Sequence, residues 1–360
     1  IEPIDKWLLD EPEVLKDIQE DIHPNVLGAY IYDLETHERG APEGNAKIGV
    51  GEGHLWCLPH DSNVIEFYHR TDLVEKAGSS YEELLEGITI DDWFEICKNI
   101  HNPPDLYASG ITGKWSWICH GVWLSMLWSN GGDIYDPKTF DPHGWLDSAE
   151  ALEVTEILKD LYDKYCPKES INWTEYDTAQ QMGYLGRLAG TPWEYGTSAF
   201  VKEIKDHEYV WTPYGEKIKT GISPRIDPNK PPRPNMGGWG LGIVSHVKDE
   251  DVKRAAYEFA KFVISKENAR RYVRATGQPA RSSALLDPEN LKLMPYFEGH
   301  EKSLRICKWR HPIAEYWEMD GIIGKNLADC LLGKLSPKEC LSKSTKEVYD
   351  LFVKTGRIKS

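Results

Sequence analysis

The sequence has no apolar run of the roughly 18–20 residues that a membrane-spanning helix needs. It also lacks an excess of basic charge, because 42 Lys and Arg against 58 Asp and Glu give a formal net charge of −16. That sign opposes binding to phosphate backbones and anionic lipid, so nucleic acid is not expected as a partner. The first residues are amphipathic and acidic, unlike a signal peptide.

Motifs for catalysis, metal binding and cofactor binding are missing as well. No HExxH, P-loop, GxSxG or GxGxxG pattern occurs. The seven cysteines include no CxxC pair, and none of the 12 histidines shows metal-ligand spacing. We therefore expect neither a metal nor a cofactor. Several cysteines lie in apolar helical contexts such as "LADCLLG", which indicates buried free thiols.

The chain is long and rich in tryptophan. Its 360 residues exceed what one compact core usually holds, so we expect two lobes. Helical and extended patterns are mixed, which favours an α/β fold. Thr89 and Ser336 are each followed three residues later by a carboxylate, and this spacing predicts helix starts.

Trp193, one of 14 tryptophans, lies in "RLAGTPWEYGT". Gly190, Pro192 and Gly196 predict a loop there, so the ring has no helix face on which to pack. Two interpretations stay open. The ring is either a stacking platform for a flat apolar ligand face or a loop residue that covers the edge of a core.

Three further tryptophans allow the same two interpretations, ligand contact or core packing. Trp115 and Trp117 have period-two spacing and would point to one side of an extended segment, as ligand-facing rings or as core. Trp239 alternates with glycines in "GGWGLGI", which predicts a strand with one bare face. A ligand could approach there, or the strand could pack tightly in a core.

Helical spacing places aromatic residues in two more segments. Tyr316 and Trp317 are adjacent, so they cannot both face the same core, and one is expected at a surface or cleft. Residues 249–277 predict two helices, and the predicted apolar face of the first consists of Ala256, Phe259, Phe262 and Val263.

Acidic residues near these aromatics raise the possibility of a glycosidase, which needs two carboxylates roughly 5–10 Å apart. The candidates are Asp61, Glu66, Glu194, Glu318 and Asp320. Sequence alone does not give their separation, and a solvated or hydrogen-bonding role is the simpler interpretation of each.

Five segments, in order, resemble one family. They are "IEPIDKWL", "GHLWCLPHDSNVIEFYHRTDLVEKAG", "TAQQMGYLGRLAGTPW", "GGWGLGI" with the helices up to "GQPARSSAL", and "YWEMDGIIGKNLADCLLGKLSPKECL". Together they are similar to the extracellular solute-binding proteins of sugar ABC importers, the maltose-binding-protein-like group. The resemblance covers nearly the whole chain.

The resemblance implies a two-lobe periplasmic-binding-protein fold of class II type, with a hinge and a ligand cleft between the lobes. One lobe would comprise residues 1–60 and 240–308, and the other residues 61–239 and 309–360. The ligand-binding residues carried over are Trp193, Trp239, Trp317, Tyr316, Asn63, Asp61 and His60, with Trp115 and Trp117 matched approximately.

The implied function is non-catalytic binding of a mono- or oligosaccharide and its delivery to the permease subunits of an ABC importer. We expect a monomer at the periplasmic or extracellular face of the membrane. The family's usual N-terminal stretch of about a hundred residues is missing, so the first lobe is expected to be incomplete. The alternatives are a carbohydrate-active hydrolase and the same fold binding a polyol, peptide or polyamine.

Overall fold

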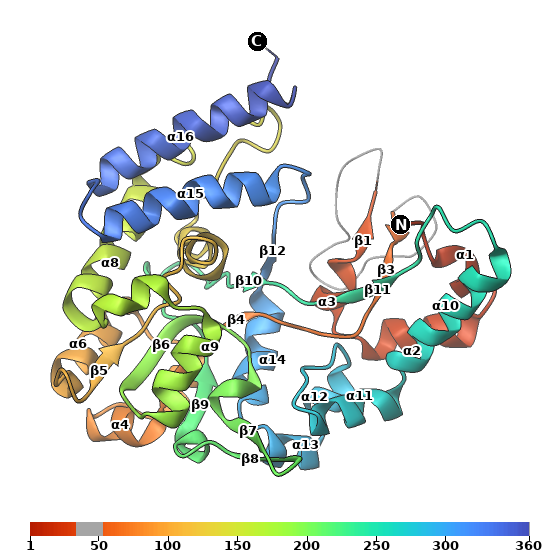
Figure 1. Cartoon of the computed structure of the whole chain (residues 1–360), viewed down its shortest axis with the longest axis horizontal. Helices are drawn as coiled ribbons and strands as arrows, with labels where there is room; N and C mark the ends of the chain where they lie inside the picture. Colours follow the sequence, from red (N-terminus) through yellow and green to blue (C-terminus); the bar gives the residue numbers. More distant parts are fainter. Residues whose placement is uncertain (34–52, 360) are drawn as a thin grey trace. The chain divides into compact units, whose positions relative to one another are not determined.

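The computed structural model describes residues 1–33 and 53–359 (Figure 1). The chain divides into two compact units. Unit 1 consists of Ile1–Val64 and Met236–Pro312, and unit 2 of Ile65–Asn235 and Ile313–Ser360. The sequence placed its lobe boundaries after residues 60, 239 and 308, whereas the units divide after residues 64, 235 and 312.

Unit 2 is built on a four-stranded sheet with the strand order β5-β6-β4-β9. Its strands are β4 (Ile65–Arg70), β5 (Tyr107–Ser109), β6 (Leu188–Tyr195) and β9 (Ile218–Gly221). Strand β6 is parallel to β5 and antiparallel to β4, which in turn is antiparallel to β9. All residues of β4 and β6 are buried, as expected for central strands that are covered on both faces.

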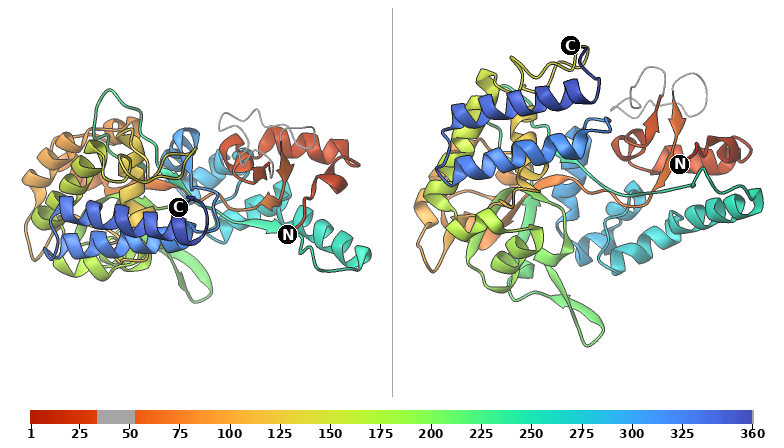
Figure 2. Two further views of the ribbon diagram at one scale, coloured as in Figure 1. Left: turned by 90° about the horizontal axis from the view of Figure 1, so that it is seen from above. Right: turned by 45° about the horizontal axis from the view of Figure 1, so that its top comes forward.

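The other elements of unit 2 are mostly helices. They are α4 (Thr71–Lys76), α5 (Tyr81–Glu86), α6 (Ile90–Ile100), the π-helix η1 (Cys119–Trp123), α7 (Leu124–Ser129), α8 (Ala149–Tyr165), η2 (Lys168–Asn172), α9 (Glu175–Ala179), the π-helix η3 (Gln180–Tyr184), η4 (Ser198–Phe200), η5 (Gly215–Lys217), α15 (Tyr316–Leu331) and α16 (Pro337–Lys354), with the hairpin β7 (Lys202–Lys205) and β8 (Glu208–Trp211). Helices α15 and α16 lie side by side, and the hairpin extends away from the rest of the unit (Figure 2). The predicted helix starts at Thr89 and Ser336 are confirmed, since both form capping boxes.

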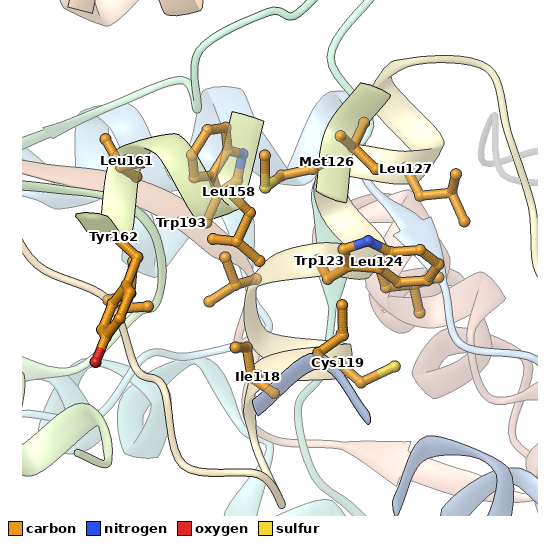
Figure 3. Packing of buried hydrophobic residues seen from close by; sticks show 14 of the residues in the cluster. Ile118, Cys119, Trp123, Leu124, Met126, Leu127, Leu158, Leu161, Tyr162 and Trp193 are labelled. Atoms are coloured by element: carbon orange, nitrogen blue, oxygen red, sulfur yellow. The ribbon is translucent and has the colours of Figure 1, made fainter. Parts of the chain in front are cut away.

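The core of unit 2 lies between its sheet and these helices. Trp93, Trp123 and Trp193 are all fully buried in it. Figure 3 shows Trp123 and Trp193 among side chains that include Leu124 and Leu127 of α7 and Leu158 and Leu161 of α8. The Trp123 indole N–H donates to Thr155 Oγ1 at 2.9 Å, so the ring is both packed and hydrogen-bonded.

Unit 1 is largely helical, with short two-stranded ladders. Its elements are α1 (Asp5–Leu8), α2 (Pro12–Asp21), α3 (Pro24–Gly28), β1 (Ile31–Tyr32), β2 (His54–Leu55), β3 (Cys57–Pro59), β11 (Gly240–Gly242), α10 (Glu250–Val263), α11 (Lys266–Arg274), α12 (Ser282–Leu285), α13 (Pro288–Leu293), α14 (Phe297–Ile306) and β12 (Lys308–Trp309), and β10 (Asn235–Met236) begins at its boundary. Strand β11 pairs antiparallel with β3, which fixes the place of the glycine-rich segment.

The apolar face predicted for α10 is not the face that unit 1 buries. Phe259 and Phe262 are 60% and 61% exposed. The opposite face is buried, where Tyr257 stacks on Trp7 with ring centroids 5.5 Å apart. Glu11 adds ion pairs to basic residues of the same helix. These contacts with the N-terminal segment orient α10. The sequence periodicity of α10 alone did not predict them.

All seven cysteines are free, and six of them are buried, as predicted for those in apolar helices. Burial raises the pKa of the Cys166 thiol, so the thiol stays protonated. Among the residues that the structure describes, no helix has the length and apolar character needed to span a membrane.

Candidate ligand-binding site

Two neighbouring aromatic residues at the start of α15 have opposite environments. Tyr316 is 5% exposed and belongs to the core of unit 2, whereas Trp317 is 59% exposed. The expectation that one of the pair lies at a surface is therefore confirmed. Tyr316 packs in the core, which leaves Trp317 as the ring that a ligand could reach.

Trp115 lies against the same helix. It is 53% exposed, and its ring approaches Gly321, where an added Cβ would lie 3.6 Å from the indole. At Gly324 an added Cβ would lie only 2.0 Å from the Trp115 carbonyl oxygen, so the backbone can come this close only to glycine. Because Trp317 and Gly321 are four residues apart, Trp115 and Trp317 occupy the same side of α15.

Trp117 and Trp317 both contact a buried histidine, His120. The centroid of its ring lies 5.4 Å from the Trp117 ring and 5.3 Å from the Trp317 ring. His120 is only 4% exposed, and its Nδ1 lies 2.9 Å from Asp320 Oδ2. Residues 115–117 form a turn, so the predicted extended segment is wrong. Trp117 lies beside His120, whereas Trp115 lies against α15 at Gly321 and Gly324.

Buried hydrogen bonds fix the backbone beneath this histidine. The Asn235 side-chain amide donates to the His120 carbonyl at 2.7 Å and to the Tyr195 hydroxyl oxygen at 2.9 Å. The Tyr195 hydroxyl in turn donates to the His120 carbonyl at 3.4 Å. His120 lies in η1, a π-helix, and such bulges are frequent at functional sites.

A buried carboxylic acid lies nearby. Glu194 is 1% exposed and accepts a hydrogen bond from Thr112 Oγ1 at 2.6 Å. Burial, reinforced by the negative charge of Glu175, raises the pKa of Glu194 to about 8. Burial also raises the pKa of Glu175. At neutral pH, Glu194 is therefore mostly a neutral acid.

In unit 1, four of the predicted residues lie together. The Trp239 carbonyl accepts the backbone N–H of His60 at 3.1 Å and that of Asp61 at 3.3 Å. Gly237 N–H donates to the Asn63 carbonyl at 2.8 Å. The Trp239 ring is 70% exposed, so this patch combines a reachable aromatic face with polar side chains.

Asp61 supplies the electrostatic character of this patch. Its Oδ2 accepts the Tyr272 hydroxyl at 3.0 Å, while Oδ1 is buried without a partner among the described residues. Burial raises the pKa of Asp61 to about 6. The Asn63 side-chain oxygen is likewise buried and unsatisfied. Both oxygens are closed off from solvent, so the exposed ring of Trp239 is the part of this patch that a ligand could reach.

A separate groove of about 380 Å³ lies within unit 1, between α10, α11 and the chain at Pro59 and His60. Its walls combine the apolar side chains of Phe262, Val263 and Ala269 with side chains that can hydrogen-bond, namely His60, Asn268, Arg271, Tyr272 and Arg281. None of the exposed rings of Trp115, Trp239 and Trp317 lines it, so we do not place the stacking site in this groove.

The prediction of a loop at Trp193 is wrong. The residue belongs to β6, where pairing with β4 overrides the local turn signals of glycine and proline. The side chain is 1% exposed and packs in the core of unit 2 (Figure 3). Of the two interpretations of Trp193, its position favours core packing, so we leave it out of the proposed site.

Comparison with known proteins identifies the family. The family model described as bacterial extracellular solute-binding protein matches residues 4–270, well over half of the chain. This chain belongs to that family. A probable ABC transporter-binding protein of Deinococcus radiodurans is 23% identical to it over 299 residues, which cover 77% of this chain and 64% of that protein.

Solved structures of this family share the fold. A solute-binding protein of Agrobacterium radiobacter K84 in complex with ribitol is 20% identical, with a TM-score of 0.77 over 98% of this chain and 80% of its own. Maltose-bound MalE3 of T. maritima is 22% identical, with a TM-score of 0.71 over 92% and 82%. The predicted α/β fold of the periplasmic-binding-protein type is thereby confirmed.

This solute-binding protein spans less than two thirds of the length of the curated relatives that it matches, 64% of one and 36% of another.

Sequence reasoning found Trp115, Trp117 and Trp317 but did not single out His120. That residue lies in an apolar helical stretch, and its partner Asp320 is 200 positions away. No local signal connects the two.

Proposed function

We propose that this chain binds a carbohydrate, either a sugar or a polyol, without catalysis and delivers it to an ABC importer. The observation that carries the proposal is the pair of exposed rings, Trp115 and Trp317, at the same side of α15, where Asp320 pairs with the buried His120. Flat aromatic faces stack on the C–H faces of sugars, and fixed polar groups select hydroxyl positions.

The relatives support the same class of ligand. Their solved structures hold ribitol, maltose, tagatose and mannitol. The patch of Trp239, Asp61 and Asn63 in unit 1 also presents an exposed ring, that of Trp239. We propose that both patches contribute to ligand binding, and each can be tested by its own substitution.

Isothermal titration with ribitol, mannitol, tagatose and maltose tests the proposal. We expect at least one of them to bind, and Trp317→Ala to weaken that binding at least tenfold. Trp211→Ala is the matched control, since Trp211 lies on the β7–β8 hairpin under Lys202, away from α15. Absence of binding to all four compounds would contradict the proposal.

The hydrolase alternative calls for a reachable pair of carboxylates. The adjacent pair of Glu66 and Glu194 lies within the sheet, with exposures of 0% and 1%. A sugar cannot reach these groups while the sheet is intact. Release of chromophore from nitrophenyl glycosides would favour hydrolysis, whereas we expect retention of unchanged ligand.

The remaining parts of the proposal concern partners and location. We propose that the chain acts as a monomer at the periplasmic or extracellular face of the membrane, where the permease subunits of an importer receive the ligand. The family assignment supports this location and this kind of partner. Sedimentation velocity of the ligand-bound chain tests the monomer.

A further inference from the structure

The orientation of the His120 ring is fixed on several sides. Nδ1 is held by Asp320, and the Trp117 and Trp317 rings both contact the imidazole. The carbonyl of the same residue is held by Asn235 and Tyr195. Both the backbone and the ring are therefore set before any ligand arrives, which lowers the entropic cost of using the ring for recognition.

The Asp320 partner also determines which ring nitrogen carries the proton. An ionised carboxylate only accepts hydrogen bonds, so Nδ1 of the neutral imidazole must be the donor. Nε2 is then left with a lone pair and acts as an acceptor. No described residue hydrogen-bonds to Nε2, and Nε2 is not one of the buried unsatisfied atoms, so it keeps access to solvent.

We infer that His120 Nε2 accepts a hydrogen bond from a ligand hydroxyl and that Asp320 is the residue that positions it. This inference rests on the proposed function and specifies its chemistry. The ligand must present a hydroxyl donor next to the C–H face that stacks on Trp317. A deoxy analogue that lacks this hydroxyl leaves Nε2 unpaired and binds at least tenfold more weakly.

Two substitutions of His120 separate ligand recognition from folding. His120→Asn retains an amide that can donate to Asp320 from the position of Nδ1 but removes the acceptor at the position of Nε2. His120→Gln instead extends an amide oxygen toward the position of Nε2. With the best binder among ribitol, mannitol, tagatose and maltose, we expect His120→Asn to lose at least tenfold in affinity and His120→Gln to recover part of it.

Nitrogen-15 NMR of histidine-labelled protein reads the ring directly. We expect His120 to show the Nδ1–H tautomer and its Nε2 resonance to move when the binding compound is added. Asp320→Asn should reduce the population of that tautomer, because an amide can donate to Nδ1 as well as accept from it. His143 is the internal control, since its Nδ1 bonds Asp141 at 2.7 Å on the exposed surface. Its Nε2 resonance should not move.

The outcomes separate the inference from the function on which it rests. If none of ribitol, mannitol, tagatose and maltose binds the unmodified chain, the proposed function fails and the inference fails with it. If a compound binds, but the His120 resonance stays in place and His120→Asn binds as tightly as the unmodified chain, only the inference is overturned.

Discussion

Glu66 of β4 and Glu194 of β6 are directly opposite each other in the sheet of unit 2, and both side chains are buried. Opposed residues on antiparallel strands have Cβ atoms about 5 Å apart, so two negative charges there would repel each other. Burial raises the pKa of Glu194 from 4.5 to about 8, so the carboxyl group of Glu194 is mostly uncharged at neutral pH.

The pKa of Glu194 implies a pH-dependent stability. Between pH 4.5 and about 8, Glu194 keeps its proton in the folded state but has lost it in the unfolded state. The contribution is therefore complete below pH 4.5 and is lost as the pH rises toward 8. In urea titrations, the unfolding free energy of the unmodified chain should fall as the pH rises. Glu194→Gln should make this fall smaller by up to about 1.4 kcal/mol per pH unit. Glu318→Gln, at a largely exposed carboxylate, is the control, and an equal effect of both substitutions would contradict the assignment.

Trp193 and Trp317 should respond oppositely to truncation. Trp193 is fully buried, so Trp193→Ala should cost about 3–5 kcal/mol of unfolding free energy. Trp317 is 59% exposed, so Trp317→Ala should change stability by about 0.5 kcal/mol or less while weakening ligand binding. Thermal denaturation and calorimetry measure the two effects. A stable Trp193→Ala variant that has lost only ligand binding would restore the ligand-stacking interpretation of Trp193.

The glycines of α15 provide a matched pair for the Trp115 contact. Gly324→Ala brings a methyl group to 2.0 Å from the Trp115 carbonyl, so the turn that carries Trp115 must move and ligand affinity should fall. Gly321→Ala meets the Trp115 ring at an ordinary 3.6 Å and should leave affinity nearly unchanged. Both substitutions raise helix propensity by the same roughly 1 kcal/mol, so the difference between them isolates the close approach.

The patch in unit 1 is tested at Trp239. Because its ring is 70% exposed, Trp239→Ala should leave the melting temperature unchanged and weaken ligand binding about tenfold. Phe259→Ala is the control, as its side chain is 60% exposed in the same unit but lies on α10. If both substitutions leave affinity intact, Trp239 does not contact the ligand.

Local signals predicted local structure well. The helix starts at Thr89 and Ser336 follow from side chains that cap their own backbone three residues away. The opposite environments of Tyr316 and Trp317 follow from helical geometry, since adjacent residues cannot face the same core. Predictions failed where pairing partners are remote, as for Trp193 in β6 and for the face that α10 buries.

The sequence alone predicted the family and the mixed α/β class of this protein from the order of its motifs. Each motif is a contiguous stretch, so it can be identified without knowing the tertiary structure. The tertiary structure decided which tryptophans are core and which are surface, and it brought His120 to Asp320. The physical reason is that exposure and hydrogen-bond partners depend on segments that lie far apart in the chain. Two hundred residues separate that pair, and only the packing of α15 on η1 brings them within 2.9 Å.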